Sequence, residues 1–354
     1  MLLSHDGQPP LTHPSVATIG FFDGVHLGHR YLIRQVQVAA RQRGLASMVV
    51  SFPVHPRRVM QASFQPHLLL SCAEKVENLA LTGLDQCLMV DFTPQLAMLT
   101  AREFMTLLRD RYSVRALVIG HDHRFGHNRA EGLADYVRHG HQLGMEVIAA
   151  LPLATSQAQL ADDPLCAHPQ RTVGLQAQPH ATAEGPSDPT QDALGPHLPA
   201  PGPTVSSSLI RRLLEAGDVS TAASYLGYNY FLQGDVVSGH HIGRTLGYPT
   251  ANLQVDCPDR VIPADGVYAV RVSLAGQTYG GMMNIGLRPT ADNGTDRSLE
   301  VHVFGLHADL YRHAMRVNFV TRLRPERRFD SLHQLAAQLQ DDERRAKQAL
   351  MMVD

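Results

Sequence analysis

From residue 15 to about residue 150, the chain alternates short apolar runs with amphipathic stretches of helical period. The expected strands are 16–20, 46–52, 86–91, 116–120 and 145–151, and the expected helices are 30–43, 73–83, 100–111 and 132–143. Strands that alternate with helices in this way form parallel sheets, with ligands at the carboxyl ends of the strands. The first part of the chain is therefore predicted to be an α/β domain with a doubly wound parallel sheet.

The pattern changes after residue 227. Short β runs separated by glycine and proline follow one another, at 231–238, 266–274, 280–285, 299–304 and 315–323. Runs of this kind are typical of a small antiparallel β-barrel. An amphipathic segment at 331–351 is expected to form a terminal helix that packs on the barrel.

Residues 156–203 separate these regions and have no apolar period. They are rich in Ala, Gln, Pro, Gly, Asp and His, which is typical of a flexible insertion. We therefore expect the sheet domain over 1–155, the insertion over 156–203, completion of the sheet domain over 204–226, and the barrel domain over 227–354.

Composition excludes several classes of protein. A formal net charge of −2 does not favour nucleic-acid binding, and the absence of long apolar runs argues against a membrane span. Four widely spaced cysteines and an N-terminus unlike a signal peptide favour a cytoplasmic protein. Lys75 and Lys347 are the only lysines, and neither lies in a glycine loop, so a Walker-type phosphate loop is excluded. The sequence does not predict an oligomeric state.

The turn after the first strand reads Gly20-Phe21-Phe22-Asp23-Gly24-Val25-His26-Leu27-Gly28-His29. It opens a helix, whose N-terminus offers free N–H donors and a positive dipole end to phosphate. His26 and His29 can donate to phosphate oxygens there, and Gly28 lets a phosphate approach the backbone. Two structural or metal-binding histidines remain an alternative.

Two further clusters carry polar groups. Residues 120–129, after the fourth strand, contain Asp122, Arg124 and Phe125, and their alternative is a solvated loop. Residues 206–211 begin a helix with three serines and Arg211, and their alternative is an ordinary helix cap. A weaker segment at 52–57, after the second strand, could also be only a rigid turn.

Residues 18–29, 122–126 and 206–211 together resemble the bacterial FAD synthetases, which are His-x-Gly-His nucleotidylyltransferases. The resemblance implies that the phosphate of FMN attacks the α-phosphorus of ATP and releases pyrophosphate. It assigns His26, His29 and Arg211 to catalysis and Asp122 and Phe125 to flavin binding. The residues that it implies for nucleotide and phosphate binding are Gly20, Phe22, Asp23, Gly24, Gly28, Ser207 and Ser208. Ser208 replaces a frequent threonine, and His123 stands where an aromatic residue is usual.

The second domain carries a glycine-rich motif at 239–252. Gly239, Gly243 and Gly247 permit a backbone that wraps a phosphate. Thr250 and Asn252 present oxygen ligands on one side of an extended segment. A glycine-rich hairpin is the alternative.

Glu300 lies in a strand in which Leu299, Val301 and Val303 share one face. It therefore points to the other face, where a carboxylate can accept a proton from a substrate hydroxyl. A solvent-facing glutamate is the alternative.

These segments, together with 266–269, 284–286, 309–311 and 324–329, resemble bacterial riboflavin kinase. The resemblance implies transfer of the γ-phosphate of ATP to the 5′-hydroxyl of riboflavin. Glu300 would be the base, Thr250 and Asn252 would hold Mg²⁺, and Gly243 and Gly247 would bind phosphate. Arg312 stands where glycine is usual.

The two resemblances predict a bifunctional enzyme that acts on riboflavin, FMN and ATP with Mg²⁺. Two alternatives stay open: a barrel kinase whose first domain uses another acceptor or is inactive, and a flavin-sensing regulator without catalysis.

Overall fold

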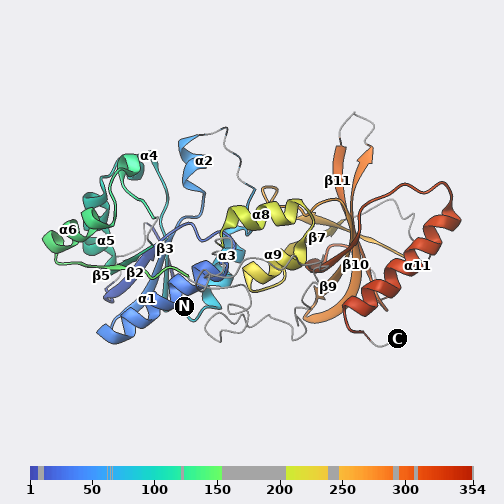
Figure 1. The fold of residues 1–354 in the computed structure, drawn as a ribbon, viewed down its shortest axis with the longest axis horizontal. Coiled ribbons are helices and arrows are strands. Elements are labelled where there is room, and N and C mark those ends of the chain that lie inside the picture. Colours follow the sequence, from blue (N-terminus) through green and yellow to red (C-terminus); the bar gives the residue numbers. More distant parts are fainter. Residues whose placement is uncertain are drawn as a thin grey trace, which may run out of the picture.

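The computed structural model describes residues 1–6, 12–61, 63, 65, 67–120, 123–153, 205–237, 247–289, 295–306 and 310–352. A parallel sheet and a closed barrel lie side by side, and two short helices lie between them (Figure 1). The insertion expected at 156–203 lies outside the described residues.

The first region is a six-stranded parallel sheet in the order β1-β4-β3-β2-β5-β6. Its strands are β1 (Leu2–His5), β2 (Ser15–Ile19), β3 (Ala46–Ser51), β4 (Gln86–Met89), β5 (Val114–Ile119) and β6 (Glu146–Ala149). The predicted doubly wound sheet is confirmed. Strand β1 was not predicted, because it is a four-residue edge strand whose Leu2 and Leu3 side chains are exposed.

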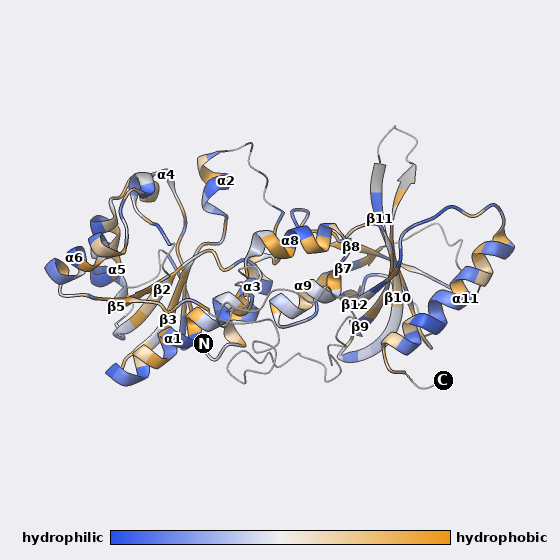
Figure 2. Ribbon diagram, viewed as in Figure 1, coloured by the Kyte–Doolittle hydropathy of each residue, from blue (hydrophilic) through white to orange (hydrophobic). Residues whose placement is uncertain are grey.

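Helices cover both faces of this sheet. Helices α1 (Leu27–Arg43) and α3 (Cys72–Ala80) pack on one face, where Ile33 and Leu79 meet Val49 of β3. Helices α5 (Ala101–Tyr112) and α6 (Leu133–Leu143) pack on the other face. Figure 2 shows the apolar strands between these amphipathic helices. The short elements α2 (Pro56–Met60), α4 (Pro94–Ala97) and η1 (His127–Arg129) lie in the connections.

The strand order places a topological switch point beside β2. From β2 the chain winds outward through β3 and β4, and it then returns to β5 on the opposite side of β2. The loops that follow β2 and β5 therefore leave the sheet in different directions. A crevice opens between such loops in doubly wound folds, at the carboxyl ends of the strands.

The second region is a closed antiparallel barrel in the order β10-β11-β8-β7-β12-β9. Its strands are β7 (Phe231–Val237), β8 (Ala251–Val255), β9 (Gly266–Leu274), β10 (Gln277–Pro289), β11 (Thr295–Val303) and β12 (Ala314–Arg324). The predicted barrel is confirmed, and β8, expected only as an extended segment, is one of its strands. The terminal helix α11 (Leu332–Ala349) packs on the barrel through Ala346, and its buried Asp342 pairs with Arg324 of β12.

Helices α8 (Ser207–Glu215) and α9 (Val219–Leu226) join the two regions (Figure 1). One apolar cluster runs from Leu79 under the sheet, through Ile210 and Leu226, to Phe319 inside the barrel. The sheet and the barrel are therefore packed against a shared apolar layer, and movement of one against the other would expose it.

Candidate active sites

A cavity of about 680 Å³ lies at the carboxyl ends of the sheet strands, at the switch point. Its lining combines aromatic rings with cationic side chains. The phenylalanines are Phe21, Phe52, Phe92, Phe104 and Phe125, and the basic residues are His55, Arg57, His67, His123, Arg124, Arg129 and Arg211. Such a lining suits a ligand with a flat ring system and anionic groups. Gly20, Phe125, Ser208 and Arg211 are the residues predicted from the sequence that line it.

The loop after β2 has a strained backbone. Phe22, Gly24 and Val25 have φ angles of 56°, 83° and 37°, and such values are rare for bulky residues. A Cβ atom on Gly24 would lie 2.7 Å from the Leu69 side chain, so this position requires glycine. Tyr228 donates to the Gly24 carbonyl at 2.7 Å, which holds the loop in place. Strain of this kind is typical of functional loops.

Asp23 joins this loop to segments far away in the sequence. Its carboxylate is 4 % exposed and accepts hydrogen bonds from the backbone N–H groups of Leu69 and Leu70 at 3.0 and 3.2 Å. Arg211 of α8 donates to the same carboxylate at 2.7 Å. Ser207 donates to the Asp23 carbonyl at 2.9 Å. The structure thus brings together three of the predicted phosphate-site residues.

His26 and His29 stack at the start of α1, with ring centroids 3.7 Å apart. His26 is the N-cap, and its Nδ1 accepts the His29 backbone N–H at 3.3 Å. Nε2 therefore carries the proton when this ring is neutral. The Nδ1 atom of His29 is buried without a hydrogen-bond partner among the described residues. Neither ring is part of the described cavity lining, so the predicted pair lies beside the cavity.

Phe22 and Gly28 support the histidines. The Phe22 side chain is 2 % exposed and its ring centroid lies 5.1 Å from that of His29. A Cβ atom on Gly28 would lie 3.2 Å from the His26 ring. The structure therefore places Phe22 in the core behind the histidines.

Both imidazoles are neutral at neutral pH. Burial lowers the pKa of His26 to about 3, and the cations Arg211 and Arg30 add to the effect. Burial also lowers the pKa of His29 well below its usual value, as do His26 and Lys75. Neutral rings can each donate one N–H to a bound anion, and a bound polyphosphate would favour their protonation.

This depressed pKa predicts acid sensitivity of the fold. Between pH 6.5 and 3 the unfolded chain protonates at residue 26 whereas the folded chain does not, so the free energy of unfolding falls as pH falls. Replacing His26 with asparagine, which keeps a capping oxygen, should remove about 1 to 2 kcal/mol of the loss between pH 7 and 5. Urea midpoints measured across this range test it. The control is His333→Asn at an exposed position; equal pH slopes for wild type and His26→Asn would contradict the assignment.

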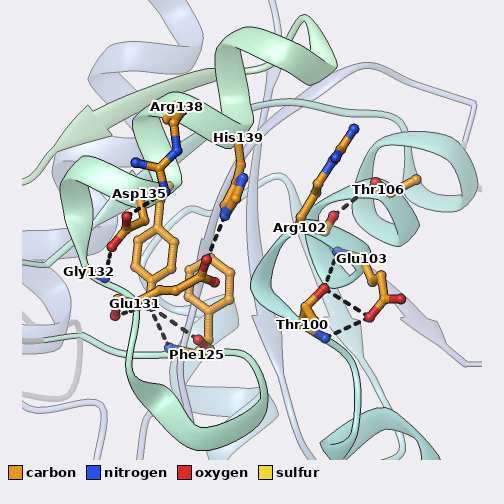
Figure 3. A network of polar contacts seen from close by, with 11 residues as sticks. Thr100, Arg102, Glu103, Thr106, Phe125, Glu131, Gly132, Asp135, Arg138 and His139 are labelled. Atoms are coloured by element: carbon orange, nitrogen blue, oxygen red, sulfur yellow. Dashed lines mark hydrogen bonds and ion pairs between the residues drawn. The ribbon is translucent and has the colours of Figure 1, made fainter.

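Phe125 is held as part of the cavity wall by Tyr136 of α6. The two rings stack with centroids 4.1 Å apart, and the Phe125 N–H donates to the Tyr136 hydroxyl at 3.0 Å. Figure 3 shows how the loop that follows is held to α6: His139 of α6 contacts Glu131 at 2.8 Å, and Asp135 of α6 accepts the Gly132 N–H. The stack and the hydrogen bond with Tyr136 give the Phe125 ring a fixed orientation. Asp122 lies outside the described residues.

Lys75 supports the cavity wall from behind, and the sequence did not reveal this role. Its ammonium donates to the Phe52 carbonyl at 2.6 Å and lies 4.0 Å from the centroid of Phe21, so one cation joins the ends of β2 and β3. Burial lowers its pKa to about 8. The only available signal was its rarity, as one of two lysines. His55 lies edge-on to Phe21 at 4.7 Å, in the segment judged weak.

The barrel register brings the second set of residues together. Glu300 of β11 pairs directly with Asn252 of β8 on one side and with Asn284 of β10 on the other. Leu299 and Val301 belong to the barrel core, so Glu300 faces outward, as predicted. Residues directly opposite in a ladder share one face, which places both asparagines beside the carboxylate.

The loop before β8 packs on the same face. His302 contacts the Pro249 carbonyl through Nδ1 at 2.8 Å, and its ring lies 5.1 Å from that of Tyr248. Tyr248 donates to Glu343 of α11 at 2.9 Å, and burial together with this carboxylate raises its pKa to about 12. Thr250 is half-buried at the end of the loop. Residues 248–250 of the predicted phosphate-binding segment are thus anchored next to Glu300.

Two glycines of the barrel domain, Gly243 and Gly247, were predicted to bind phosphate. Gly247 has a φ of 83°, which favours glycine, whereas Gly243 lies outside the described residues. Arg312, where glycine is usual in the resembling family, has a φ of 61°. The position therefore keeps the left-handed backbone although it carries a side chain.

Both regions of the chain match families of known proteins. Residues 8–162 match the family model for FAD synthetase, and residues 226–350 match that for riboflavin kinase. The bifunctional riboflavin kinase/FMN adenylyltransferase of Escherichia coli strain K12 is 33 % identical over 335 residues, which cover 94 % of this chain and 92 % of the relative. The chain belongs to this family. The Bacillus subtilis strain 168 member is 28 % identical over 349 residues, which cover 95 % of this chain and 96 % of that one.

A solved structure shares the fold of the whole chain. It is titled as the crystal structure of a macrolide-efflux protein from Streptococcus pneumoniae, and the TM-score is 0.79 at 28 % identity. The match covers 98 % of this chain and 99 % of the other. The side-by-side arrangement of sheet and barrel is therefore common to both proteins.

Proposed function

We infer that the chain is a bifunctional riboflavin kinase and FMN adenylyltransferase. The observation that carries this inference is that one chain of this family contains two separate groups of candidate site residues. One is the aromatic and basic cavity beside His26 and His29, and the other is the outer barrel face around Glu300. Riboflavin, FMN and ATP are the substrates that these activities imply.

For the kinase step, we propose that Glu300 accepts the proton of the riboflavin 5′-hydroxyl. The hydroxyl oxygen then bonds to the γ-phosphorus of ATP, the bond to the bridging oxygen breaks, and ADP leaves. Positioning and charge stabilisation carry most of the catalysis in such transfers. Gly243 and Gly247 are proposed to bind the phosphates.

For the adenylyl step, a phosphate oxygen of FMN attacks the α-phosphorus of ATP and pyrophosphate leaves. We propose that the Nε2–H of His26, together with His29, stabilises the charge of the polyphosphate in the transition state. Arg211, Ser207 and Ser208 at the start of α8 are proposed to contact phosphate oxygens. No covalent intermediate with the protein is required.

The flavin ring is assigned to the aromatic part of the cavity. Phe125 is held by Tyr136, and Phe21 and Phe52 are held by Lys75, so three phenylalanines in the wall have supported positions. Flat heteroaromatic rings pack well on such side chains. Asp122 is proposed as a second flavin contact.

Both families use ATP, and we propose Mg²⁺ as the accompanying metal. No group of three or more His, Cys, Asp or Glu side chains that could hold a metal occurs within the part of the chain that the structure describes. Thr250 and Asn252 offer hard oxygen donors next to Glu300, which fits a cation that takes most of its ligands from phosphates and water. The metal would neutralise phosphate charge there.

We also propose a cytoplasmic location. The three described cysteines, Cys72, Cys87 and Cys257, are free thiols, which suits a reducing compartment. Of the helices that the structure describes, none combines the length and apolarity needed to cross a bilayer.

Incubation of the pure protein with riboflavin, ATP and Mg²⁺ tests the function. We expect chromatography over time to show FMN first and FAD afterwards, with release of ADP and pyrophosphate. Unmodified riboflavin would contradict the assignment. Accumulation of FMN alone would favour the alternative in which the first domain uses another acceptor, and a panel of phosphorylated alcohols would then identify it.

A further inference from the structure

A short segment of the sheet domain, residues 67–71, is shared between the two regions. Its second residue pairs with the barrel in a parallel bridge: the Leu68 N–H donates to the Asp259 carbonyl at 2.7 Å, and the Val261 N–H donates to the Leu68 carbonyl at 2.9 Å. Residues 259–261 belong to the connection between β8 and β9. The backbone of the adenylyltransferase domain is therefore tied directly to the kinase barrel.

The neighbours of Leu68 bind the adenylyl-site residues. The His67 carbonyl accepts the Nε–H of Arg211 at 2.7 Å. The N–H groups of Leu69 and Leu70 bind the carboxylate of Asp23, which also binds Arg211. Within four consecutive residues, one is fastened to the barrel and three hold the loop after β2 and the start of α8. A displacement of Leu68 would therefore be transmitted to Asp23 and Arg211.

Arg260 is the side chain that fastens the barrel side of this bridge. It is 2 % exposed, pairs with Glu74 of α3, and donates to the Phe231 carbonyl at 2.6 Å. Its guanidinium also lies 5.3 Å from the centroid of Tyr230. A planar guanidinium that binds a carboxylate, a carbonyl and an aromatic ring at once holds these partners in one geometry.

Glu74 passes this restraint into the sheet domain. Its carboxylate accepts the Ser71 N–H at 2.6 Å, which closes the capping box at the start of α3 and ends the segment 67–71. The next residue is Lys75, whose ammonium joins Phe52 and Phe21 at the cavity. The first turn of α3 thus connects Arg260 on one side with the cavity wall on the other.

We propose that Arg260, a residue of the kinase barrel, is a positioning residue for adenylyl transfer. It contacts no residue assigned to the chemistry, and it acts through Leu68 and Glu74, which set the positions of Asp23, Arg211 and the phenylalanine wall. The kinase residues lie elsewhere, on the face formed by β8, β10 and β11, whereas the Arg260 side chain binds β7 and α3. The inference rests on the proposed function, because it concerns the adenylyl site of that assignment.

The test measures both activities in the same preparation of full-length Arg260→Met. We expect the kcat of FMN adenylylation to fall about tenfold to a hundredfold, because a displacement near 1 Å at a phosphoryl-transfer site has an effect of that size. Riboflavin phosphorylation should stay within about twofold of wild type. Arg260→Lys keeps the charge but not the planar guanidinium. Its kcat of FMN adenylylation should lie between those of the wild type and Arg260→Met.

A second variant keeps the test informative if Arg260→Met does not fold. In Arg260→Met the carboxylate of Glu74 is left unpaired in the interior, and such a group is strongly destabilising. Arg260→Met combined with Glu74→Gln removes both charges and should fold, with the same loss of adenylylation. All rates are taken well below the Tm of each variant, so that the ratio of the two activities does not depend on the folded fraction.

Two matched controls separate positioning from stability. Arg58→Met removes a more exposed ion pair, with Asp259, across the same junction. Asp342→Asn breaks a buried ion pair inside the barrel domain. Neither should lower the kcat of adenylylation. An unchanged activity ratio in folded Arg260→Met and in the double variant would overturn the inference, whereas absence of either activity from the wild type would instead overturn the proposed function.

Discussion

Replacement of Glu300 with alanine is expected to abolish FMN formation while conversion of supplied FMN to FAD continues. A general base contributes about 10²- to 10⁴-fold to a rate, so loss of the carboxylate should lower the kinase kcat by a factor in that range. The proposed adenylyl site lies in the other region and shares no residue with the Glu300 ladder. Separate chromatographic assays with riboflavin and with FMN as substrate measure the two effects.

Glu300→Gln keeps the shape of the side chain without its basicity and should be nearly as defective as the alanine variant. Asp235→Ala serves as a control, because Asp235 is an exposed carboxylate on β7, which β8 separates from the strand of Glu300. Equal loss of both activities in Glu300→Ala would argue against separate sites.

The reverse phenotype is expected for His29→Ala. Its Nδ1 is buried without a partner among the described residues, and its ring stacks on His26, so no hydrogen bond that the structure describes competes for this atom. Loss of one preorganised donor typically lowers kcat by about 10²- to 10³-fold. The kcat of FAD synthesis from FMN should fall by this factor, with a smaller change in KM. FMN formation from riboflavin should be unchanged.

His139→Ala is the matched control for this variant, since His139 is a partly buried histidine of the same domain that pairs with Glu131 away from α1. Normal FAD synthesis by a folded His29→Ala protein would remove the histidines from the mechanism.

The fold was largely predictable because its signals are local. Buried parallel strands read as apolar runs, as at 16–19 and 46–50, and barrel strands read as short β runs between glycines. Strand β1 carried no such signal because its leucines are exposed at a sheet edge. Helix α9 was also missed, since its apolar and small residues pack between two regions that the sequence showed only separately.

The candidate sites were predictable only in part. His26, His29, Ser207 and Glu300 lie in short motifs whose chemistry is visible within a few residues. Phe52 and Phe104 look like core residues in the sequence, and only the fold shows that they line a cavity. The pair of Glu74 and Arg260 joins positions 186 residues apart, and no local pattern indicates it.

The position of α8 has a consequence for how the protein is made. Ser208 and Arg211 complete the wall of the cavity, yet they follow every strand of the sheet in the chain. On the ribosome, where N-terminal parts emerge first, the parallel sheet can assemble while this wall is still missing. The nascent polypeptide therefore cannot complete this cavity until translation has passed residue 211, shortly before the barrel begins.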